Sequence, residues 1–295
     1  MARRAARVVL VGGALIVLAM AVALVWLKAH EDELVFAAAR SRQYLLTDWP
    51  KDAERVTVRG PGGAELAGLM FHADRGSEDA FWVLHLHGNA DSAFSKWQIR
   101  HCEALRIAGF NVLEIDYRGF GATPGQASEA GMNEDAEAAY QALLQRGVAA
   151  DHIILLGHSL GSGPAVQLAS HRRAAALVLF GAFTSIPDAA AERYPYLPVR
   201  LAVAIQFDSL ASIGRVHVPV VIAHSRADTL IPYSHALRLF AAANEPKKLL
   251  TIDAPANDGF GGHVDALYEH VDMLQAALTG LVPAIAPAIA SVARP

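Results

Sequence analysis

The pattern that points most directly to chemistry is a Gly-x-Ser-x-Gly pentad at residues 157–161, with Ser159 at its centre. It follows the apolar run 153–156 and precedes small residues typical of a helix. Between a strand and a helix, such a pentad forms a sharp turn that exposes the serine hydroxyl. We predict that Ser159 is a nucleophile and that the backbone N–H of Leu160 helps to stabilise an oxyanion.

A nucleophilic serine needs a base that takes its proton and an acid that orients the base. His263 follows the last predicted strand in a glycine-rich loop, from which an imidazole can reach across the end of a sheet. Asp228 lies in the loop after the strand predicted at 218–223, between Ser159 and His263 in the chain. We therefore predict a catalytic triad of Ser159, Asp228 and His263.

Three other acids are rivals of Asp228. Asp253 and Asp258 are nearer to His263 in the sequence, although Asp253 ends a predicted strand and could simply cap it. Asp265 stands where a helix is expected to begin, a position at which an acid interacts favourably with the helix dipole. Spacing favours Asp228.

The second oxyanion donor is expected in the loop after the strand predicted at 81–86. The backbone N–H of Asn89 is the natural donor there. His87, in the same loop, is expected to hydrogen-bond the turn, and His85 is expected to point to the other side of the strand. His158 is expected to pack beside the serine without reacting.

The elements that must position these residues alternate along the chain. A hairpin is predicted around the turn at 60–63. Helical patterns then separate apolar strands predicted at 81–86, 111–117, 153–158, 177–180, 218–223 and 248–252. Such alternation predicts an α/β fold with a mostly parallel sheet, helices on both faces, and chemistry at the carboxyl ends of the strands.

The alternation breaks between about residues 186 and 214, a stretch that holds prolines and aromatics but no strand pattern. An insertion above the strand ends is expected to form a small cap over the site. The tail at 281–295 is rich in alanine and proline and is expected to be flexible.

Bulk composition narrows the classes of function. The chain has 295 residues and a formal net charge of −4, so it lacks the basic excess typical of nucleic-acid binding. The single cysteine, Cys102, cannot form an intramolecular disulfide and is expected to be a core residue. The sequence shows no cluster with metal-ligand spacing, so neither a metal nor an organic cofactor is predicted. Protein partners and oligomeric state are left open.

An uncharged apolar run at 8–27 is long enough to span a bilayer as a helix. Three arginines precede it and three acids follow it closely, which favours a cytoplasmic N-terminus and a catalytic domain outside the cytoplasm. We expect a retained signal anchor, because the apolar region of a cleaved signal peptide is normally shorter. Cleavage at a small-x-small site such as 19–21 is the alternative.

These patterns divide the chain into parts. A basic N-terminus at 1–7, a transmembrane helix at 8–27 and a connector at 28–50 come before a catalytic domain at 51–280, with its cap at about 186–214 and the tail at 281–295. A chain beginning near Lys51 is expected to be soluble and active, because the alternation of strands and helices starts after the connector.

Several motifs are long and unusual. They are His-Gly-Asn-Ala at 87–90, Asp-Tyr-Arg-Gly-Phe-Gly at 116–121, the pentad, and the segments 183–188, 207–210, 226–232 and 262–263. Over roughly residues 51–270 they resemble the α/β-hydrolase superfamily, and most closely its membrane-anchored bud-emergence-type branch, which is similar to the animal hydrolase-domain depalmitoylases. The resemblance implies the α/β-hydrolase fold and assigns nucleophile, acid and base to Ser159, Asp228 and His263.

We interpret the chain as a membrane-anchored serine hydrolase that cleaves carboxylic esters or thioesters through an acyl-enzyme on Ser159. Its expected partners are a small-molecule or lipid acyl ester and, through the helix, a membrane. An aminopeptidase or other amide hydrolase is the alternative, which an acidic pocket for a free amine would indicate, with Asp188 or Glu192 as the acid. A non-catalytic binding protein of the same fold is a third interpretation, disfavoured by the complete triad.

Overall fold

One twisted sheet organises the molecule. The computed structural model describes residues 2–46, 49–73, 80–253 and 259–290. The eight strands of the sheet lie in the order β1-β2-β4-β3-β5-β6-β7-β8, with antiparallel pairing at β1–β2 and β2–β4 and parallel pairing elsewhere. This confirms the predicted hairpin followed by a parallel sheet. The strands are β1 (Ala53–Arg59), β2 (Glu65–Phe71), β3 (Trp82–Leu86), β4 (Asn111–Ile115), β5 (Ile153–His158), β6 (Ala176–Phe180), β7 (Val220–Ser225) and β8 (Lys247–Ile252).

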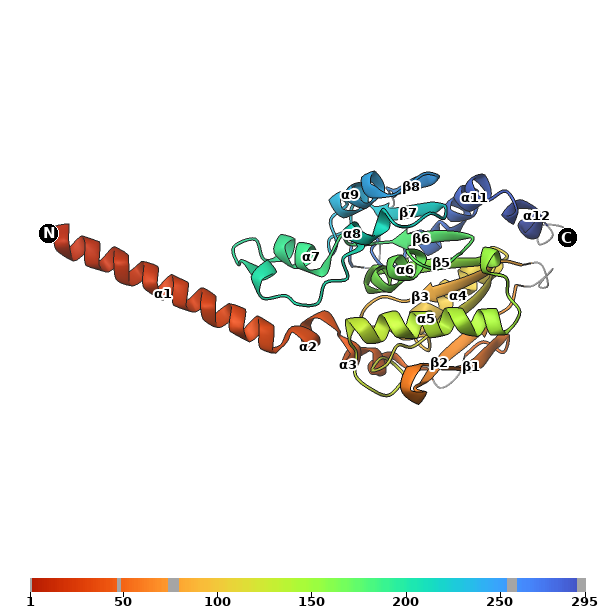
Figure 1. The fold of residues 1–295 in the computed structure, drawn as a ribbon, viewed down its shortest axis with the longest axis horizontal. Coiled ribbons are helices and arrows are strands. Elements are labelled where there is room, and N and C mark those ends of the chain that lie inside the picture. The colour runs from red at the N-terminus through yellow and green to blue at the C-terminus, as the bar shows by residue number, and fades with distance from the viewer. Residues whose placement is uncertain (1, 47–48, 74–79, 254–258, 291–295) are drawn as a thin grey trace.

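Helices cover both faces of this sheet (Figure 1). One face carries α5 (Glu129–Gln145), α6 (Ser162–Ala169), α8 (Ser209–Ile213) and α9 (Ser234–Ala242). The other carries α4 (Lys96–Ile107), α10 (Ala266–Glu269), α11 (Val271–Leu281) and α12 (Ile285–Ala290).

The central strands are apolar throughout because both of their faces are buried. In β5, Leu155 belongs to the core cluster beneath α5 and α6, whereas Ile154 and Leu156 belong to the cluster beneath α4 and α11. Alternate side chains of a strand point to opposite faces, so a strand covered on both sides reads as a continuous apolar run. This is why residues 153–156 contain no polar side chain.

Helix α1 (Ala2–Ala29) stands apart from the sheet and points away from it (Figure 1). The segment Ala6–Ala29 has a mean hydropathy of 3.0, and its apolar stretch is not buried within the protein. By length and composition it is able to cross a membrane, and an N-terminal signal sequence has the same properties. The helix begins before and ends slightly after the predicted span at 8–27.

The connector at 28–50 packs against the rest of the chain. It forms the short helices α2 (Glu31–Val35) and α3 (Ala38–Ser41). Phe36 is buried in the main core cluster, and Ser41 Oγ accepts a hydrogen bond of 2.7 Å from Gly121 N–H. A chain that begins at Lys51 would lose these contacts, so we no longer expect such a chain to be fully active.

The C-terminal segment also differs from expectation over its described part. Where the sequence predicts a flexible tail from residue 281, the chain forms helix α12 over Ile285–Ala290. Ile285 is fully buried against the core cluster on the α11 face of the sheet, which gives this short helix an anchor. Residues 291–295 lie outside the described residues.

Helix α6 approaches the sheet unusually closely at the glycines that flank Ser159. A Cβ atom added at Gly157 would lie 2.6 Å from the Cβ of Ala165, and one at Gly161 would collide with the carbonyl oxygen of Leu86 in β3. The two glycines therefore allow α6 to start directly against β3 and β5. They fix the position of the serine between them.

We predict that Gly161→Ala destabilises the protein by more than about 3 kcal/mol, because the backbone of β3 cannot move without breaking the sheet. Gly280→Ala is the matched control. No atom lies within 4 Å of a Cβ added there, so this helical site should lose no stability and gain up to about 1 kcal/mol. Denaturant unfolding of both variants measures the difference, and equal stabilities would contradict the close-packing argument.

Candidate active site

The turn after β5 holds Ser159 in an unusual backbone conformation. Its φ is +49°, a left-handed value that a residue with a side chain rarely adopts. The turn continues through a 3-10 segment at Ser159–Gly161 into α6, and Ser162 Oγ donates to Ser159 O at 2.6 Å. Ser159 is thus presented at the carboxyl end of a central strand, as the pentad predicts.

Two loops from neighbouring strands bring His263 and Asp228 to this serine. His263 Nε2 lies 2.8 Å from Ser159 Oγ, and His263 Nδ1 lies 2.7 Å from Asp228 Oδ2. Asp228 follows β7 and His263 follows β8, so all three side chains gather at one edge of the sheet. The histidine and aspartate are buried, whereas the serine is partly accessible.

The carboxylate of Asp228 is held by a complete set of donors. Its Oδ1 accepts hydrogen bonds from the backbone N–H groups of Leu230 and Ile231, at 2.8 and 2.9 Å. His224 Nε2 lies 3.1 Å from Oδ2, the oxygen that His263 also contacts. Burial alone raises the pKa of Asp228, but the hydrogen bonds from His224, His263 and Ile231 hold it well below its ordinary value. The group is therefore a carboxylate at neutral pH.

The rival acids lie elsewhere. Asp253 is largely exposed, and its Oδ1 lies 2.9 Å from Arg226 Nε. Asp265 accepts from His101 Nε2 at 2.9 Å. Asp258 lies outside the described residues. Of the acids that the structure describes, Asp228 is the one brought to His263.

His158 contributes to this site in a way that the sequence did not reveal. It stacks on Phe180, and its Nε2 donates to the backbone carbonyl of His263 at 2.9 Å. Burial lowers the pKa of His158 well below its ordinary value, so the ring is neutral. It packs beside the serine, as expected, and it also fixes the backbone of His263. Only the three-dimensional contact shows this, because the two residues are 105 positions apart.

Asn89 and Leu160, the expected oxyanion donors, both line the pocket that contains Ser159. The side chain of Asn89 has a further role: its Oδ1 accepts from Ala37 N–H at 2.8 Å, and its Nδ2 donates to Val35 O at 2.7 Å. The loop that carries one expected donor is therefore tied to the connector. No sequence pattern pointed to this contact.

Comparison with known proteins gives the family. The family model described as serine aminopeptidase, S33, matches residues 78–206. An uncharacterized protein of Mycobacterium tuberculosis (strain CDC 1551 / Oshkosh) is 39% identical over 199 residues, which cover 67% of this chain and 69% of the relative. The lysophosphatidylserine lipase ABHD12 of Danio rerio is 33% identical over 187 residues, which cover 57% of this chain and 48% of the lipase. The chain belongs to the α/β-hydrolase superfamily.

Solved structures agree with this assignment at the level of the fold. An esterase of Pyrococcus furiosus superposes on this chain with a TM-score of 0.62 and 20% sequence identity, covering 81% of this chain and 96% of the esterase. The predicted α/β-hydrolase fold is therefore confirmed.

A pocket of about 280 Å³ contains Ser159 in its lining and is mainly apolar. The segment 186–214, predicted to form a cap, lines it through α7 (Ile186–Arg193) and the 3-10 turn Val199–Leu201. The N-terminal segment and the loop after β7 also line it. The apolar lining includes Leu27, Leu34, Val35, Phe183, Ile186, Tyr194, Val199, Leu230 and Ile231.

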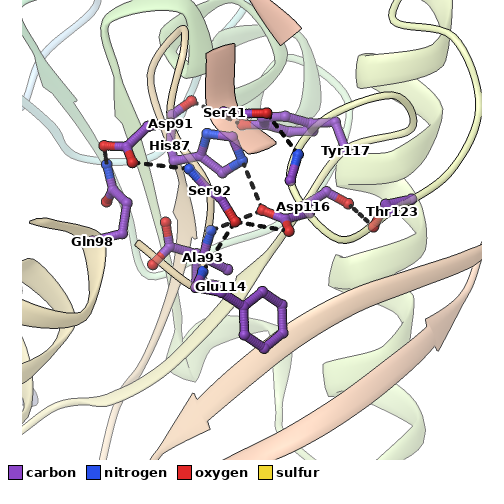
Figure 2. A network of polar contacts seen from close by, with 12 residues as sticks. Ser41, His87, Asp91, Ser92, Ala93, Gln98, Glu114, Asp116, Tyr117 and Thr123 are labelled. Carbon is purple, nitrogen blue, oxygen red and sulfur yellow. Dashed lines mark hydrogen bonds and ion pairs between the residues drawn. The ribbon is translucent and has the colours of Figure 1, made fainter. Parts of the chain in front are cut away.

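A buried polar network supports the loops beneath the expected oxyanion donors (Figure 2). Asp116 accepts from Ser92 Oγ at 3.0 Å and from the backbone N–H groups of Ala93 and Ala122 at 2.8 and 2.7 Å. His87 Nε2 lies 3.7 Å from Asp116 Oδ1. The His87 ring also hydrogen-bonds the turn, as expected, through Nδ1 and Gly88 O at 2.8 Å. The loops at 88–93 and 119–122 are thus held by one carboxylate.

A second buried cluster lies deeper in the sheet. Cys102 Sγ donates to Glu114 Oε2 at 2.8 Å, and His85 Nδ1 lies 3.3 Å from Glu114 Oε1. His85 Nε2 lies 2.6 Å from Tyr268 OH. Cys102 is fully buried, as predicted. His85, Cys102 and Glu114 are residues of metal-ligating types, and their ligand atoms lie within 4.8 Å of one another. The Cys102–Glu114 hydrogen bond and the close His85–Glu114 contact join these three side chains in one buried polar cluster.

Asp116 predicts a pH dependence of stability. Burial raises its pKa from 3.8 to about 6, although His87 and the hydrogen bonds that it accepts oppose the shift. The folded protein therefore binds this proton more tightly than the unfolded chain, so the free energy of unfolding should fall as pH rises from about 4 to about 6. By this shift Asp116 accounts for about 3 kcal/mol of that fall, and Asp116→Asn should remove it.

The measurement is denaturant unfolding of both proteins between pH 4 and pH 7. Subtracting the curve of Asp116→Asn from that of the unmodified chain cancels the other titrating groups. A stability difference that stays constant across this range would contradict the raised pKa.

Proposed function

We propose that this chain is a serine hydrolase that cleaves carboxylic esters or thioesters through an acyl-enzyme on Ser159. The observation that carries the proposal is the continuous contact Ser159–His263–Asp228 at the end of an apolar pocket. Each contact is within hydrogen-bond distance, and the base is oriented by a carboxylate that stays ionised.

In the proposed first half-reaction, Ser159 Oγ attacks the acyl carbonyl carbon while its proton passes to His263 Nε2. The negative charge that develops on the carbonyl oxygen is stabilised by the N–H groups of Asn89 and Leu160. His263 then gives its proton to the departing alkoxide or thiolate, and the acyl group remains on Ser159. Asp228 stabilises the imidazolium that forms in between.

In the second half-reaction a water molecule attacks the acyl-enzyme. Its proton passes to His263 Nε2, its oxygen bonds to the acyl carbon, and the resulting intermediate releases the carboxylic acid as Ser159 Oγ takes the proton back. Every proton is therefore shuttled by one imidazole, and the step needs no co-reactant besides water.

The alternative of an aminopeptidase requires an acid that is free to bind a substrate amine. Asp188 instead pairs with Arg238 and Arg200 at 2.6 and 2.7 Å. Glu192 lies 3.3 Å from His235 Nε2. Among the described residues that line the pocket, the acid is Glu31. Its carboxylate already accepts hydrogen bonds from Lys28 Nζ and from the backbone N–H groups of Ala204 and Ile205. These pairings favour an ester or thioester over a peptide with a free amine.

We propose that this chain belongs to the membrane-anchored bud-emergence-type branch of the superfamily, which is similar to the animal hydrolase-domain depalmitoylases. Its supporting features are the shared motifs, the N-terminal apolar helix and the apolar pocket. The Danio rerio relative is a lysophosphatidylserine lipase, which is in line with an acyl ester substrate.

The proposal predicts that a fluorophosphonate probe labels the intact protein and that Ser159→Ala abolishes both labelling and ester hydrolysis. The rate should fall by several decades, because the nucleophile is absent.

Asp228→Asn should keep the fold but lower kcat by up to about 10⁴, since the imidazole loses its orienting anion. Asp253→Asn is the matched control and should hydrolyse esters at the unmodified rate. Wild-type turnover by Ser159→Ala would rule the proposal out, and damage confined to Asp253→Asn would reassign the acid.

We further propose that α1 is retained as a signal anchor, with a cytoplasmic N-terminus and the catalytic domain outside the cytoplasm. Arg3, Arg4 and Arg7 precede the apolar segment, and acids follow it, which supports this orientation. A reporter that is active only outside the cytoplasm, fused to the C-terminus, should therefore be active. N-terminal sequencing of the membrane fraction should find the original N-terminus. A start within residues 20–35 would establish cleavage instead, and a cytoplasmic reporter signal would reverse the orientation.

A further inference from the structure

The end of the apolar helix and the segment after it form part of the wall of the pocket. Leu27 is in the last turn of α1, and Leu34 and Val35 are in α2, yet all three line the pocket with Ser159. In Figure 1, α1 leaves the domain on the same side as α7 and the chain that follows it. The pocket that contains Ser159 therefore reaches the last turn of the apolar helix.

Two carboxylates hold residues 204–207, the irregular segment of the cap that precedes α8. Glu31 Oε1 accepts from the backbone N–H groups of Ala204 and Ile205, at 2.5 and 2.6 Å. Glu129, at the start of α5, accepts from the next two, Gln206 and Phe207, at 2.8 and 2.7 Å. Four successive amides are thus divided between one carboxylate next to the apolar helix and one on the catalytic domain.

The surroundings of Glu31 stabilise its carboxylate in this contact. Its side chain is 8% exposed, and its other oxygen pairs with Lys28 Nζ at 2.8 Å. Burial by itself raises the pKa of Glu31, but the hydrogen bonds from Lys28, Ile205 and Ala204 lower it by more. The pKa therefore lies below its ordinary value, and the group stays ionised. Charge-assisted hydrogen bonds of this kind are about twice as strong as neutral ones, which makes Glu31 a firm link between α2 and the cap.

The same N-terminal segment is tied to the chemistry through Asn89. The Asn89 side chain binds Val35 O and Ala37 N–H, while its backbone belongs to the loop expected to stabilise the oxyanion. Residues 31–37 thus contact both the cap that covers the pocket and the loop at its base. A segment with these two contacts positions the pocket as well as joining it to the helix.

The outer surface of the cap is suited to a membrane interface. Tyr196 is 91% exposed and Leu201 is 84% exposed, and both lie in the cap segment that follows α7. Tyr194 and Trp26, at the end of the apolar helix, are about half exposed. Tyrosine and tryptophan favour the level of the lipid headgroups, where one end of the ring is apolar and the other is wet.

We propose that residues 27–37 form a built-in wall of the active site, along which the acyl chain of a bilayer-resident ester passes from the membrane to Ser159. This rests on the proposed hydrolase activity and adds a role for the N-terminal segment: it guides to Ser159 the chain of a lipid or lipidated molecule that stays in the bilayer until it is cleaved. Glu31 is a positioning residue that keeps this wall closed against the cap.

The test uses the full chain reconstituted in phosphatidylcholine vesicles and two esters with the same leaving group, 4-nitrophenyl palmitate in the bilayer and 4-nitrophenyl acetate in water. Glu31→Ala should lower the palmitate-to-acetate ratio of kcat/KM about tenfold, the loss expected when about two methylene groups leave an apolar wall. Glu33→Ala, an exposed acid on the same short helix, is the matched control and should keep the ratio.

Leu34→Ser provides an independent variant in case Glu31→Ala does not fold. Leu34 is about half exposed, so its truncation removes apolar wall without emptying the core, and it should lower the same ratio severalfold. An unchanged ratio in the folded variants, or an unmodified chain that prefers the acetate, would overturn this inference while fluorophosphonate labelling of Ser159 still supports hydrolysis. Absence of labelling in the unmodified chain would instead refute the hydrolase activity itself.

Discussion

The close approach of α6 to β3 and β5 is the constraint on which the site depends. Gly157 and Gly161 leave no room for a side chain, so the helix starts against the backbone of the sheet. The chain between them must turn sharply, and Ser159 takes a left-handed conformation as a result. The same turn places Ser159 and Leu160 together at the edge of the pocket, where one is expected to attack and the other to stabilise charge.

Around this turn the protein buries two carboxylates, Asp228 and Asp116, and both accept several hydrogen bonds. Asp228 has His224, His263 and two backbone amides, and Asp116 holds two loops through backbone amides and Ser92. Burying a carboxylate without such partners would lower the stability of the fold. The loops are therefore held in the positions from which their N–H groups donate to these carboxylates. This arrangement positions the imidazole of His263 without help from the substrate.

The pocket and the apolar helix are physically continuous. Glu31 links α2 to the cap, and Asn89 links the following residues to the loop at the base of the pocket. Under our proposals, the same short segment serves both substrate access and membrane attachment. A change in how the helix sits in a bilayer would be transmitted to the cap by hydrogen bonds rather than through a flexible linker.

The sequence by itself determined the alternating fold and the pentad with Ser159, because strand periodicity and turn chemistry are local. It favoured Asp228 and His263 as partners of the serine, and the tertiary structure brings Asp228, and not Asp253 or Asp265, to His263. The sequence also determined the length and apolar character of the first helix. Only the tertiary structure decided that the connector lines the pocket, that His158 holds His263, and that Glu31 and Glu129 share the amides of the cap. These contacts join residues up to 174 positions apart. They follow from which surfaces the folded sheet brings together, and no local pattern in the chain encodes that.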